Sequence, residues 1–213
     1  MITNIKRLIT PFLLCAYLLC ACQSNSARKQ SNEGAHKYDT TSIVADLLSK
    51  ANRCDSYAQD YILQGRVIKR MYFLFKKNGK DFYSYRSDYN NGGVKLIRLF
   101  NVEGKYDYEY YPETKTAIRR PKKGEWNETN YADAKKWHFN FDGYEVVGER
   151  QVNGKDCFVL ESKDYVITVW KENGLQTSLS SKGSNGPPLE FDNFEFNLNE
   201  DIFTIPNGTQ IKE

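Results

Sequence analysis

The stretch Tyr72-Phe73-Leu74-Phe75-Lys76-Lys77-Asn78-Gly79-Lys80-Asp81-Phe82-Tyr83 decides the fold of this chain. Before Asn78-Gly79, aromatic and aliphatic side chains occupy both alternating phases, and a second β-rich run follows the dipeptide. An Asn-Gly pair between two such runs is the strongest short-range signal for a β-hairpin, because both residues readily adopt positive φ. The stretch therefore predicts two neighbouring antiparallel strands, the first of which is apolar on both faces.

Turn signals of the same kind separate further β-rich runs. Asn153-Gly154 and Asn173-Gly174 repeat the Asn-Gly pair, and such pairs between neighbouring runs favour an up-and-down antiparallel sheet over βαβ units. A change of phase between Phe191 and Phe194 predicts a β-bulge near Asp192-Asn193. The predicted strands are Tyr61–Lys69, Met71–Lys77, Asp81–Ser87, Val94–Asn101, Lys105–Tyr111, Thr114–Arg119, Tyr144–Val152, Asp156–Ser162, Tyr165–Lys171, Gln176–Ser181 and Leu189–Phe196.

Two segments show the helical spacing of apolar residues. The first runs from Ile43 to Ala51 behind the capping residues Thr41-Ser42, and it predicts an amphipathic helix. The second runs over residues 127–141, and we expect it to form a lid across the mouth of a strongly curved sheet. A surface helix packed on a solid sandwich would give the same pattern. The lid candidates on its apolar face are Tyr131, Ala134 and Trp137.

The composition indicates one globular domain with appendages. The chain has 213 residues, of which 40% are hydrophobic and 27% are charged, so it can bury a substantial core. Its formal net charge of +3 is too small to indicate a nucleic-acid partner. With two histidines and no recognisable catalytic, phosphate-binding or metal-binding motif, the sequence predicts a protein that is not an enzyme and uses no cofactor or metal.

The N-terminal segment has the features of a signal peptide. An apolar run over Leu8 to Leu19 is shorter than the about 20 residues that a membrane-spanning helix needs. It ends in Leu19-Cys20-Ala21-Cys22, which resembles the bacterial lipoprotein box. The resemblance implies that residues 1–21 are removed and that Cys22 carries lipid, with acyl chains such as palmitate. A secretory signal that happens to contain cysteines, or an uncleaved anchor, is the alternative.

A polar tether is expected to follow Cys22. Residues 23–40 contain no Val, Ile, Leu, Met, Phe or Trp, so they cannot bury enough apolar surface to become ordered, and His36 should be solvated. Such a tether has a typical span of about 23 Å and a ceiling near 60 Å. Gln23, directly after the lipidated position, favours the outer membrane in the Gram-negative sorting rule that the pattern resembles. The expected location is therefore the outer membrane, with a single domain over residues 41–213 facing the periplasm.

The C-terminal part of the chain resembles a known family. Phe191-Asp192-Asn193-Phe194-Glu195-Phe196-Asn197, followed by Asp201-Ile202-Phe203-Thr204-Ile205-Pro206, looks like the close of the outer-membrane lipoprotein carriers of the LolA/LolB/LppX superfamily. The aromatic strands and Tyr110-Tyr111-Pro112-Glu113-Thr114-Lys115 agree in order. The resemblance implies an α+β, mainly β fold: a strongly curved antiparallel sheet that forms an incomplete barrel, with an N-terminal helix and a short lid helix over an apolar interior.

The chain also departs from the carrier pattern. The carriers latch the lid with an arginine from an early strand, whereas residues 81–85 lack one and Arg86 is displaced. The soluble carrier is not lipidated, whereas this chain has a lipobox. A tethered lipid-binding relative or acceptor is therefore expected in place of a shuttle between membranes.

The resulting hypothesis is a membrane-anchored protein that holds a lipid, an acyl chain or the acyl group of a lipoprotein, in lipoprotein sorting or envelope lipid trafficking. The alternative is an envelope interaction protein with a filled core that docks another envelope protein. The predicted cavity residues occupy apolar phases of the strands, and they are Tyr72, Leu74, Phe82, Leu96, Tyr108, Val159, Ile167, Val169 and Phe194.

Three further residues carry chemistry that is open to two interpretations. Cys54 and Cys157 either form a disulfide in an oxidising periplasm or remain two separately buried thiols. His138 has no nucleophile or acidic partner visible in the sequence, so we expect a histidine on the surface of the lid helix instead of a general base.

Overall fold

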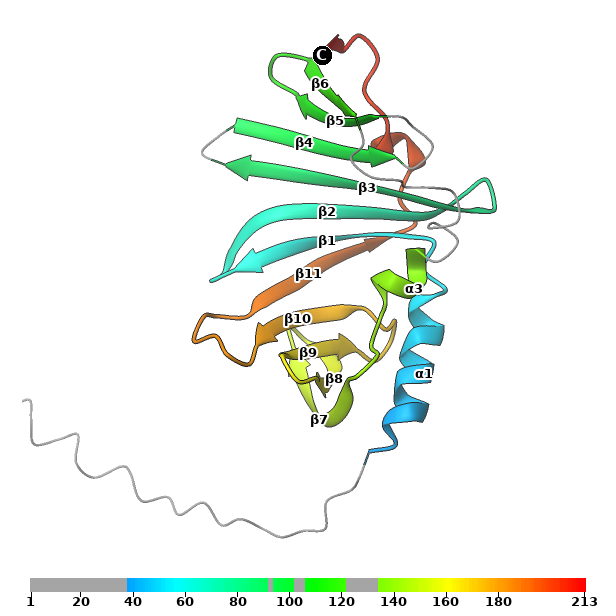
Figure 1. The fold of residues 1–213 in the computed structure, drawn as a ribbon, viewed down its shortest axis with the longest axis vertical. Coiled ribbons are helices and arrows are strands. Elements are labelled where there is room, and N and C mark those ends of the chain that lie inside the picture. The colour runs from blue at the N-terminus through cyan, green and yellow to red at the C-terminus, as the bar shows by residue number, and fades with distance from the viewer. Residues whose placement is uncertain (1–37, 92–93, 102–105, 122–133) are drawn as a thin grey trace, which may run out of the picture. The chain divides into compact units, whose positions relative to one another are not determined.

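The computed structural model describes residues 38–91, 94–101, 106–121 and 134–213. They form one open, curved sheet of 12 strands, with helices α1 (Thr40–Ala51) and α3 (Ala134–His138) and the 3₁₀ helix η1 (Glu200–Phe203) (Figure 1). The predicted class, a mainly β fold built on a curved and incompletely closed sheet, is confirmed. The strands are β1 (Ser56–Leu63), β2 (Arg66–Lys77), β3 (Lys80–Asn91), β4 (Val94–Asn101), β5 (Tyr106–Tyr111), β6 (Thr116–Pro121), β7 (Glu145–Val152), β8 (Lys155–Glu161), β9 (Tyr165–Trp170), β10 (Gln176–Ser181), β11 (Leu189–Phe196) and β12 (Gln210–Lys212).

The strand order is that of two meanders joined at β1. Along the sheet the order is β12-β6-β5-β4-β3-β2-β1-β11-β10-β9-β8-β7, so β1 pairs with β2 on one side and with β11 on the other. All of these pairs are antiparallel except β12 with β6, which is parallel and makes the sheet mixed. The sequence did not predict β12.

Two of the three predicted Asn-Gly turns have positive φ at both residues, whereas in Asn173-Gly174 only the glycine does. Asn78 and Gly79 have φ of 53° and 75°, and Asn153 and Gly154 have φ of 50° and 76°, the left-handed values of a two-residue hairpin. The predicted strand Tyr61–Lys69 is wrong, because Gln64 and Gly65 make a turn of the same kind in its middle, with φ of 53° and 71°. Glutamine seldom adopts positive φ, so this turn gave no signal in the sequence.

The predicted bulge in β11 is confirmed. The pairing of β1 with β11 shifts register between Ala58, opposite Glu195, and Asp60, opposite Asp192, and Asn193 at the shift has a φ of 52°. A bulge re-aims the side chains that follow it. It also brings the carbonyl of Asn193 to Arg70 on β2, at 3.0 Å from its Nη1.

The face of the sheet that the helices cover, called the inner face below, holds two of the three core clusters. Under α1, Leu47 packs against Val146, Leu160, Ile167 and Val169 of β7 to β9. The second cluster joins the C-terminal end of α1 and α3 to β1, β2 and β3, and its buried members are Ala51, Tyr57, Met71, Phe73, Phe75, Tyr83, Phe100, Ala134, Phe139 and Leu175.

The opposite, outer face is covered at one end by the C-terminal segment. Leu74 and Phe82 form the third core cluster with Phe203 of η1, and Tyr72 and Ile202 pack against it. The two apolar faces predicted for β2 therefore have separate covers. Helices α1 and α3 cover the inner face, and the 3₁₀ helix η1 near the C-terminus covers the outer one.

Helix α1 lies very close to the loop between β9 and β10. It begins at Thr40, and Asp39 caps it by accepting a hydrogen bond from the backbone N–H of Ser42 at 3.1 Å, so the cap lies two residues before the predicted Thr41-Ser42. A Cβ atom added to Gly174 would lie 2.1 Å from the carbonyl oxygen of Leu47. Only glycine allows this approach, and its φ of 72° also favours glycine.

All of these elements lie within one compact unit, Tyr38–Glu213, which contains the whole sheet and its core clusters. We therefore expect this range to fold on its own. Among its described residues, no helix is long and apolar enough to cross a membrane.

Candidate functional site

The inner face beneath α3 is an aromatic cluster. Tyr57 of β1 and Phe73 of β2 are cross-strand neighbours with ring centroids 5.1 Å apart, and Phe75 lies 6.3 Å from Phe73. Phe139, directly after α3, completes the layer at 5.4 Å from Phe75. Side chains two residues apart on a strand share a face, and this is why the alternating aromatic residues of β1 and β2 converge under the helix.

His138 of α3 is set into this aromatic layer. Its ring centroid lies 4.5 Å from that of Phe73 and 5.1 Å from that of Phe75, and its Nε2 lies 2.7 Å from the hydroxyl oxygen of Tyr57. Burial lowers the pKa of His138 to about 4, so the ring is neutral at pH 7, and burial raises the pKa of Tyr57. The expectation of a surface histidine is wrong, because the lid turns this side chain toward the sheet.

A second polar contact holds α3 beside the end of α1. Lys135 donates from its Nζ to the backbone carbonyl of Asn52 at 2.7 Å and to Asp55 Oδ1 at 3.2 Å. Ala134 is buried in the cluster between the helix and the sheet. The part-buried contact of His138 and the exposed contacts of Lys135 thus help to place the five residues of α3 over β1 and β2.

A cavity of about 240 Å³ opens next to this layer, between the chain around α3 and the inner face. Ile167, Leu179 and Phe191 provide an apolar wall, and the amide side chains of Gln59 and Gln176 provide hydrogen-bonding groups. The full lining is Tyr57, Gln59, Tyr61, His138, Phe139, Asn140, Phe141, Tyr144, Ile167, Gly174, Gln176, Leu179 and Phe191. Polar and apolar groups contribute about equally to this lining, whereas a typical small-ligand site is mostly apolar with a few convergent polar groups.

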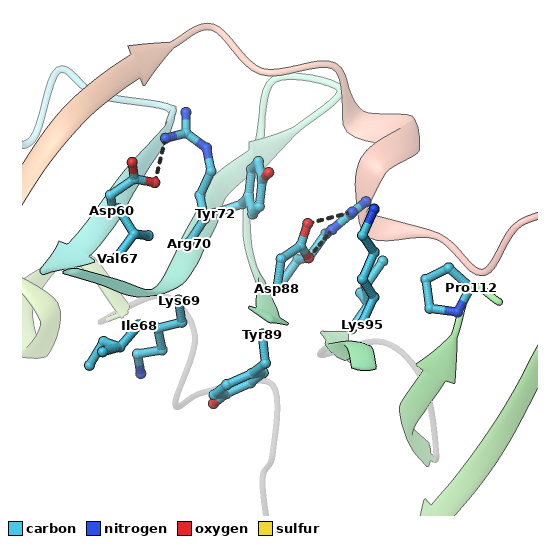
Figure 2. A pocket seen from close by; sticks show the side chains of 12 residues that line it. Asp60, Val67, Ile68, Lys69, Arg70, Tyr72, Asp88, Tyr89, Lys95 and Pro112 are labelled. Carbon is cyan, nitrogen blue, oxygen red and sulfur yellow. Dashed lines mark hydrogen bonds and ion pairs between the residues drawn. The ribbon is translucent and has the colours of Figure 1, made fainter. Parts of the chain in front are cut away.

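A second and larger pocket, of about 480 Å³, lies between the ends of β2, β3 and β4 (Figure 2). Tyr72 stands in it between two arginines, with the guanidinium carbons of Arg70 and Arg86 at 5.4 and 5.2 Å from its ring centroid. Arg70 donates to Asp60 at 2.9 Å, and Arg86 donates to both carboxylate oxygens of Asp88 at 2.6 and 2.7 Å.

Arg86 therefore does not take the place of the latch arginine of the carriers. It lies on the outer face, where it also donates to the backbone carbonyl of Ile202 at 3.1 Å and fastens η1 to the sheet. The polar contact found between lid and sheet on the inner face is the Tyr57–His138 pair.

The structure does not bring the nine predicted cavity residues together. Tyr72, Leu74 and Phe82 belong to the outer face with η1, and the strand pairing puts Tyr108 and Val159 on that face as well. Ile167 and Val169 are buried under α1, Leu96 shares the inner face with Tyr89, and Phe194 at the bulge lies 5.7 Å from Trp170. Of the nine, Ile167 lines the cavity beside the aromatic cluster, called the inner cavity below. Tyr72 lines the larger pocket between β2, β3 and β4, called the outer pocket below. The prediction of one common wall is wrong. A strand that is apolar on both faces does not show by its sequence which other element packs against each face.

The remaining predicted residues divide between described and undescribed parts of the chain. Cys22, Tyr131 and the side chain of Trp137 lie outside the described residues. Cys54 and Cys157 are free thiols. Cys157 is buried on the outer side, 3.4 Å from Thr177 Oγ1, whereas Cys54 packs against the inner aromatic cluster, so the alternative of two separate thiols holds.

The sequence reasoning missed several site residues. Tyr57, Gln59 and Tyr61 of β1 line the inner cavity, but the misplaced strand boundary hid their alternation. Correct recognition of the turn at Gln64-Gly65 would have revealed it. Among the described residues there is no group of three or more His, Cys, Asp or Glu side chains that could hold a metal ion.

The open curved sheet, with helices over one face and a cavity between the two, has a counterpart among solved structures. No family model matches the sequence, and no curated protein matches it. Among solved structures, LprF from Mycobacterium bovis has a similar fold, with a TM-score of 0.50 at 11% identity over 80% of this chain and 97% of that chain.

Two further solved structures match this chain with lower TM-scores. The complex of MucA and MucB from Pseudomonas aeruginosa gives a TM-score of 0.45 at 15% identity, over 82% of this chain and 64% of the matched chain. A LolA superfamily protein from Nitrosomonas europaea gives 0.29 at 14% identity, over 78% of this chain and 97% of that chain. This chain thus spans less than two thirds of the matched chain in the MucA–MucB complex.

Proposed function

We propose that this protein is a lipid-anchored lipoprotein of the bacterial envelope whose inner-face cavity binds the acyl chain of a lipid or of a lipoprotein. The observation that carries the proposal is the cavity between α3 and the sheet, with its apolar wall of Ile167, Leu179 and Phe191. Binding and release, without a chemical step, would be its activity. The LolA-like fold and the envelope context that such a fold suggests support the same role.

The size of the cavity sets what can enter it. Its volume of about 240 Å³ exceeds the roughly 150 Å³ of an engineered apolar cavity that takes up benzene. It lies just below the approximately 300 Å³ at which typical ligand pockets begin. The cavity therefore accommodates a segment of one acyl chain as it stands, and a whole chain requires α3 to move away from the sheet.

The contacts of α3 fit such a movement. The helix has five residues, and its polar contacts with the rest of the chain include the Tyr57–His138 hydrogen bond and the contacts of Lys135 with Asn52 and Asp55. A short element opens at a lower free-energy cost than a long packed helix. We propose that α3 is the lid, in the position that the sequence predicted for residues 127–141.

Anchoring rests on the N-terminal sequence. In the proposed mature form, acylated Cys22 precedes Tyr38 by fifteen residues (23–37), which span about 55 Å when fully extended. Two or more acyl chains hold a protein on a membrane stably, whereas a single chain does not. The domain would then work close to the membrane that supplies its ligand, proposed to be the outer membrane facing the periplasm.

Ligand binding is tested with the domain Tyr38–Glu213, freed of lipid, by displacement of a fluorescent fatty acid and by native mass spectrometry. Leu179→Trp fills the cavity and should abolish uptake, whereas Val147→Trp, an exposed residue of β7 outside the cavity, should leave it unchanged. If the unmodified domain takes up no fatty acid, or if Leu179→Trp binds as well as Val147→Trp, the cavity is not the binding site.

Anchoring is tested separately, by mass spectrometry of the protein recovered from bacterial membranes. A diacylglycerol-modified and N-acylated Cys22 is expected, and Cys22→Ala should lose both the lipid mass and the membrane fraction. A mature chain that begins elsewhere, or a Cys22 without lipid, would contradict the anchoring proposal and leave the cavity proposal intact.

One observation favours the alternative role of docking an envelope protein. Aromatic rings already fill the inner face beside the cavity, from Tyr57 through Phe75 to Phe100. If the ring layer is rigid, the cavity stays too small for a chain. Failure of fatty-acid uptake together with specific capture of an envelope protein by the folded domain would favour this second role.

A further inference from the structure

The hairpin between β1 and β2 ends in a cluster of exposed aliphatic side chains. Val67 is 54% exposed, Ile68 is 44% exposed and Leu63 is 39% exposed, all within six residues of the chain. Single exposed apolar residues are ordinary on a protein surface, whereas three together at one hairpin end are not. The pairing at the turn places Leu63 beside Arg66 on one face of the hairpin and Ile62 beside Val67 on the other, so the exposed aliphatic side chains occupy both faces of the hairpin end.

Three basic side chains lie near these aliphatic residues. Arg66 lies in the hairpin itself, and Lys69 and Lys95 line the outer pocket together with Val67 and Ile68 (Figure 2). No ion pair to any of these three cations occurs in the described part of the chain, although Lys69 lies over the ring of Tyr61 at 4.3 Å.

The acidic residues of the same pocket are already paired. Asp60 binds Arg70, and Asp88 binds Arg86, so neither carboxylate is available to neutralise Arg66 or Lys95. The surface therefore combines aliphatic side chains with unneutralised positive charge. An anionic lipid surface offers the complementary chemistry: acyl chains at the interface for the aliphatic residues, and negative headgroups for the cations.

We propose that this hairpin surface, made of Leu63, Val67, Ile68, Arg66, Lys69 and Lys95, docks on an anionic lipid bilayer. The proposal rests on the proposed anchoring in one respect, namely that a tether of fifteen residues (23–37) keeps the domain within about 55 Å of a membrane. Docking would fix the orientation of the domain on the bilayer. The pocket behind the hairpin, lined by Arg70, Tyr72 and Arg86, would then face the headgroups.

The test uses the domain Tyr38–Glu213 without its acyl anchor, in flotation with vesicles. Vesicles of phosphatidylcholine and phosphatidylglycerol in equal parts should bind the domain, and pure phosphatidylcholine vesicles should bind it at least tenfold more weakly. Binding should also weaken as salt is raised, because exposed charges are screened.

Two variants separate the contributions of the surface. Val67→Ser/Ile68→Ser should lower vesicle affinity at least tenfold, with Val147→Ser/Tyr165→Ser, which removes two exposed apolar residues elsewhere, as the matched control. Arg66→Gln/Lys95→Gln should lower the affinity about tenfold at low salt and flatten its salt dependence, against Lys80→Gln/Lys163→Gln as the control. Circular dichroism and thermal unfolding establish that each variant is folded.

Three outcomes would overturn the proposal. They are no binding to the anionic vesicles, equal losses in the hairpin and control variants, and equal binding to both kinds of vesicle. The first would leave the hairpin to a protein partner, and the second would place the contact on another part of the surface. Because Leu179→Trp blocks the inner cavity and leaves the hairpin untouched, fatty-acid uptake and vesicle binding fail independently.

Discussion

The two faces of β2 and β3 are both apolar at the end near α3, yet they are closed by different means. On the inner face, Phe73 and Phe75 meet aromatic residues and His138 of the chain around α3. On the outer face, Leu74 and Phe82 meet η1, which comes more than a hundred residues later in the chain. Beyond η1 the outer face changes from apolar packing to paired charges and an open pocket. The inner face is thus closed by helices, and the outer face is closed by η1 and carries an open pocket with paired charges beyond it.

The largest effect is expected at Gly174, where α1 comes closest to the loop between β9 and β10. Gly174→Ala should destabilise the domain by about 5 kcal/mol, because its Cβ would overlap the carbonyl of Leu47 and its φ is positive. Urea unfolding measures this value. Gly154→Ala, also at positive φ but with open space around it, should cost only about 1 kcal/mol. Similar losses in the two variants would show that the approach of α1 is not tight.

Truncations of β2 compare the two faces directly. Phe75→Ala should cost about 4 kcal/mol, because a fully buried ring is removed from the layer under α3. Leu74→Ala, its neighbour on the outer face, should cost about 3 kcal/mol. Thermal and denaturant unfolding give both numbers. A negligible loss for Leu74→Ala would mean that η1 does not close the outer face.

The pH dependence of stability reports on the surroundings of His138 in α3. His138 has a pKa of about 4 in the folded chain and an ordinary value of 6.5, so protonation favours the unfolded state. Its contribution is fully present above pH 6.5 and is lost as the pH falls toward 4, with a total of about 3 kcal/mol. His138→Gln should lack this dependence, and the difference between the two proteins, measured by unfolding between pH 7 and pH 4, removes the effect of the acidic side chains. If the free energy of unfolding changes with pH in parallel in the two proteins, His138 is not a desolvated, neutral histidine.

The smallest effect is expected at the charged residues of the outer pocket. Asp60→Ala should cost about 2 kcal/mol, because Arg70 and Asn193 lose a partly buried hydrogen-bonding partner while Arg70 keeps Glu195. Glu161→Gln, which removes an exposed ion pair with Lys182, should change stability by less than about 0.5 kcal/mol. Equal values in urea unfolding would mean that the charges of the pocket contribute no more than those of an ordinary surface.

Much of the fold follows from local chemistry, and the sequence shows it. Asn78-Gly79 and Asn153-Gly154 fix their hairpins because asparagine and glycine tolerate the left-handed backbone. The phase change around Asn193 revealed the bulge for a similar local reason. The turn at Gln64-Gly65 escaped because the tertiary pairing of β1 with β2 and β11 imposes a conformation for which glutamine has little preference of its own.

The candidate site was less predictable, because it depends on which helix or segment packs against which face of the sheet. Leu74 and Phe82 looked like cavity residues, and nothing local shows that Phe203 lies against them. His138 looked like a surface residue because its partner, Tyr57, lies 81 positions earlier in the chain. Alternation along a strand gives two phases, but long-range packing decides which of them lines a cavity.

The unequal edges of the sheet have a consequence for association between copies. At one margin, the parallel strand β12 has only three residues and ends beside Lys212. At the other, β7 has a register shift between Val146 and Gly148 and carries charged, exposed side chains such as Glu149 and Arg150. Shortness, charge and irregular pairing each discourage a foreign strand from adding to a sheet. The two edge strands of the sheet should therefore resist pairing with the edges of other copies of the protein.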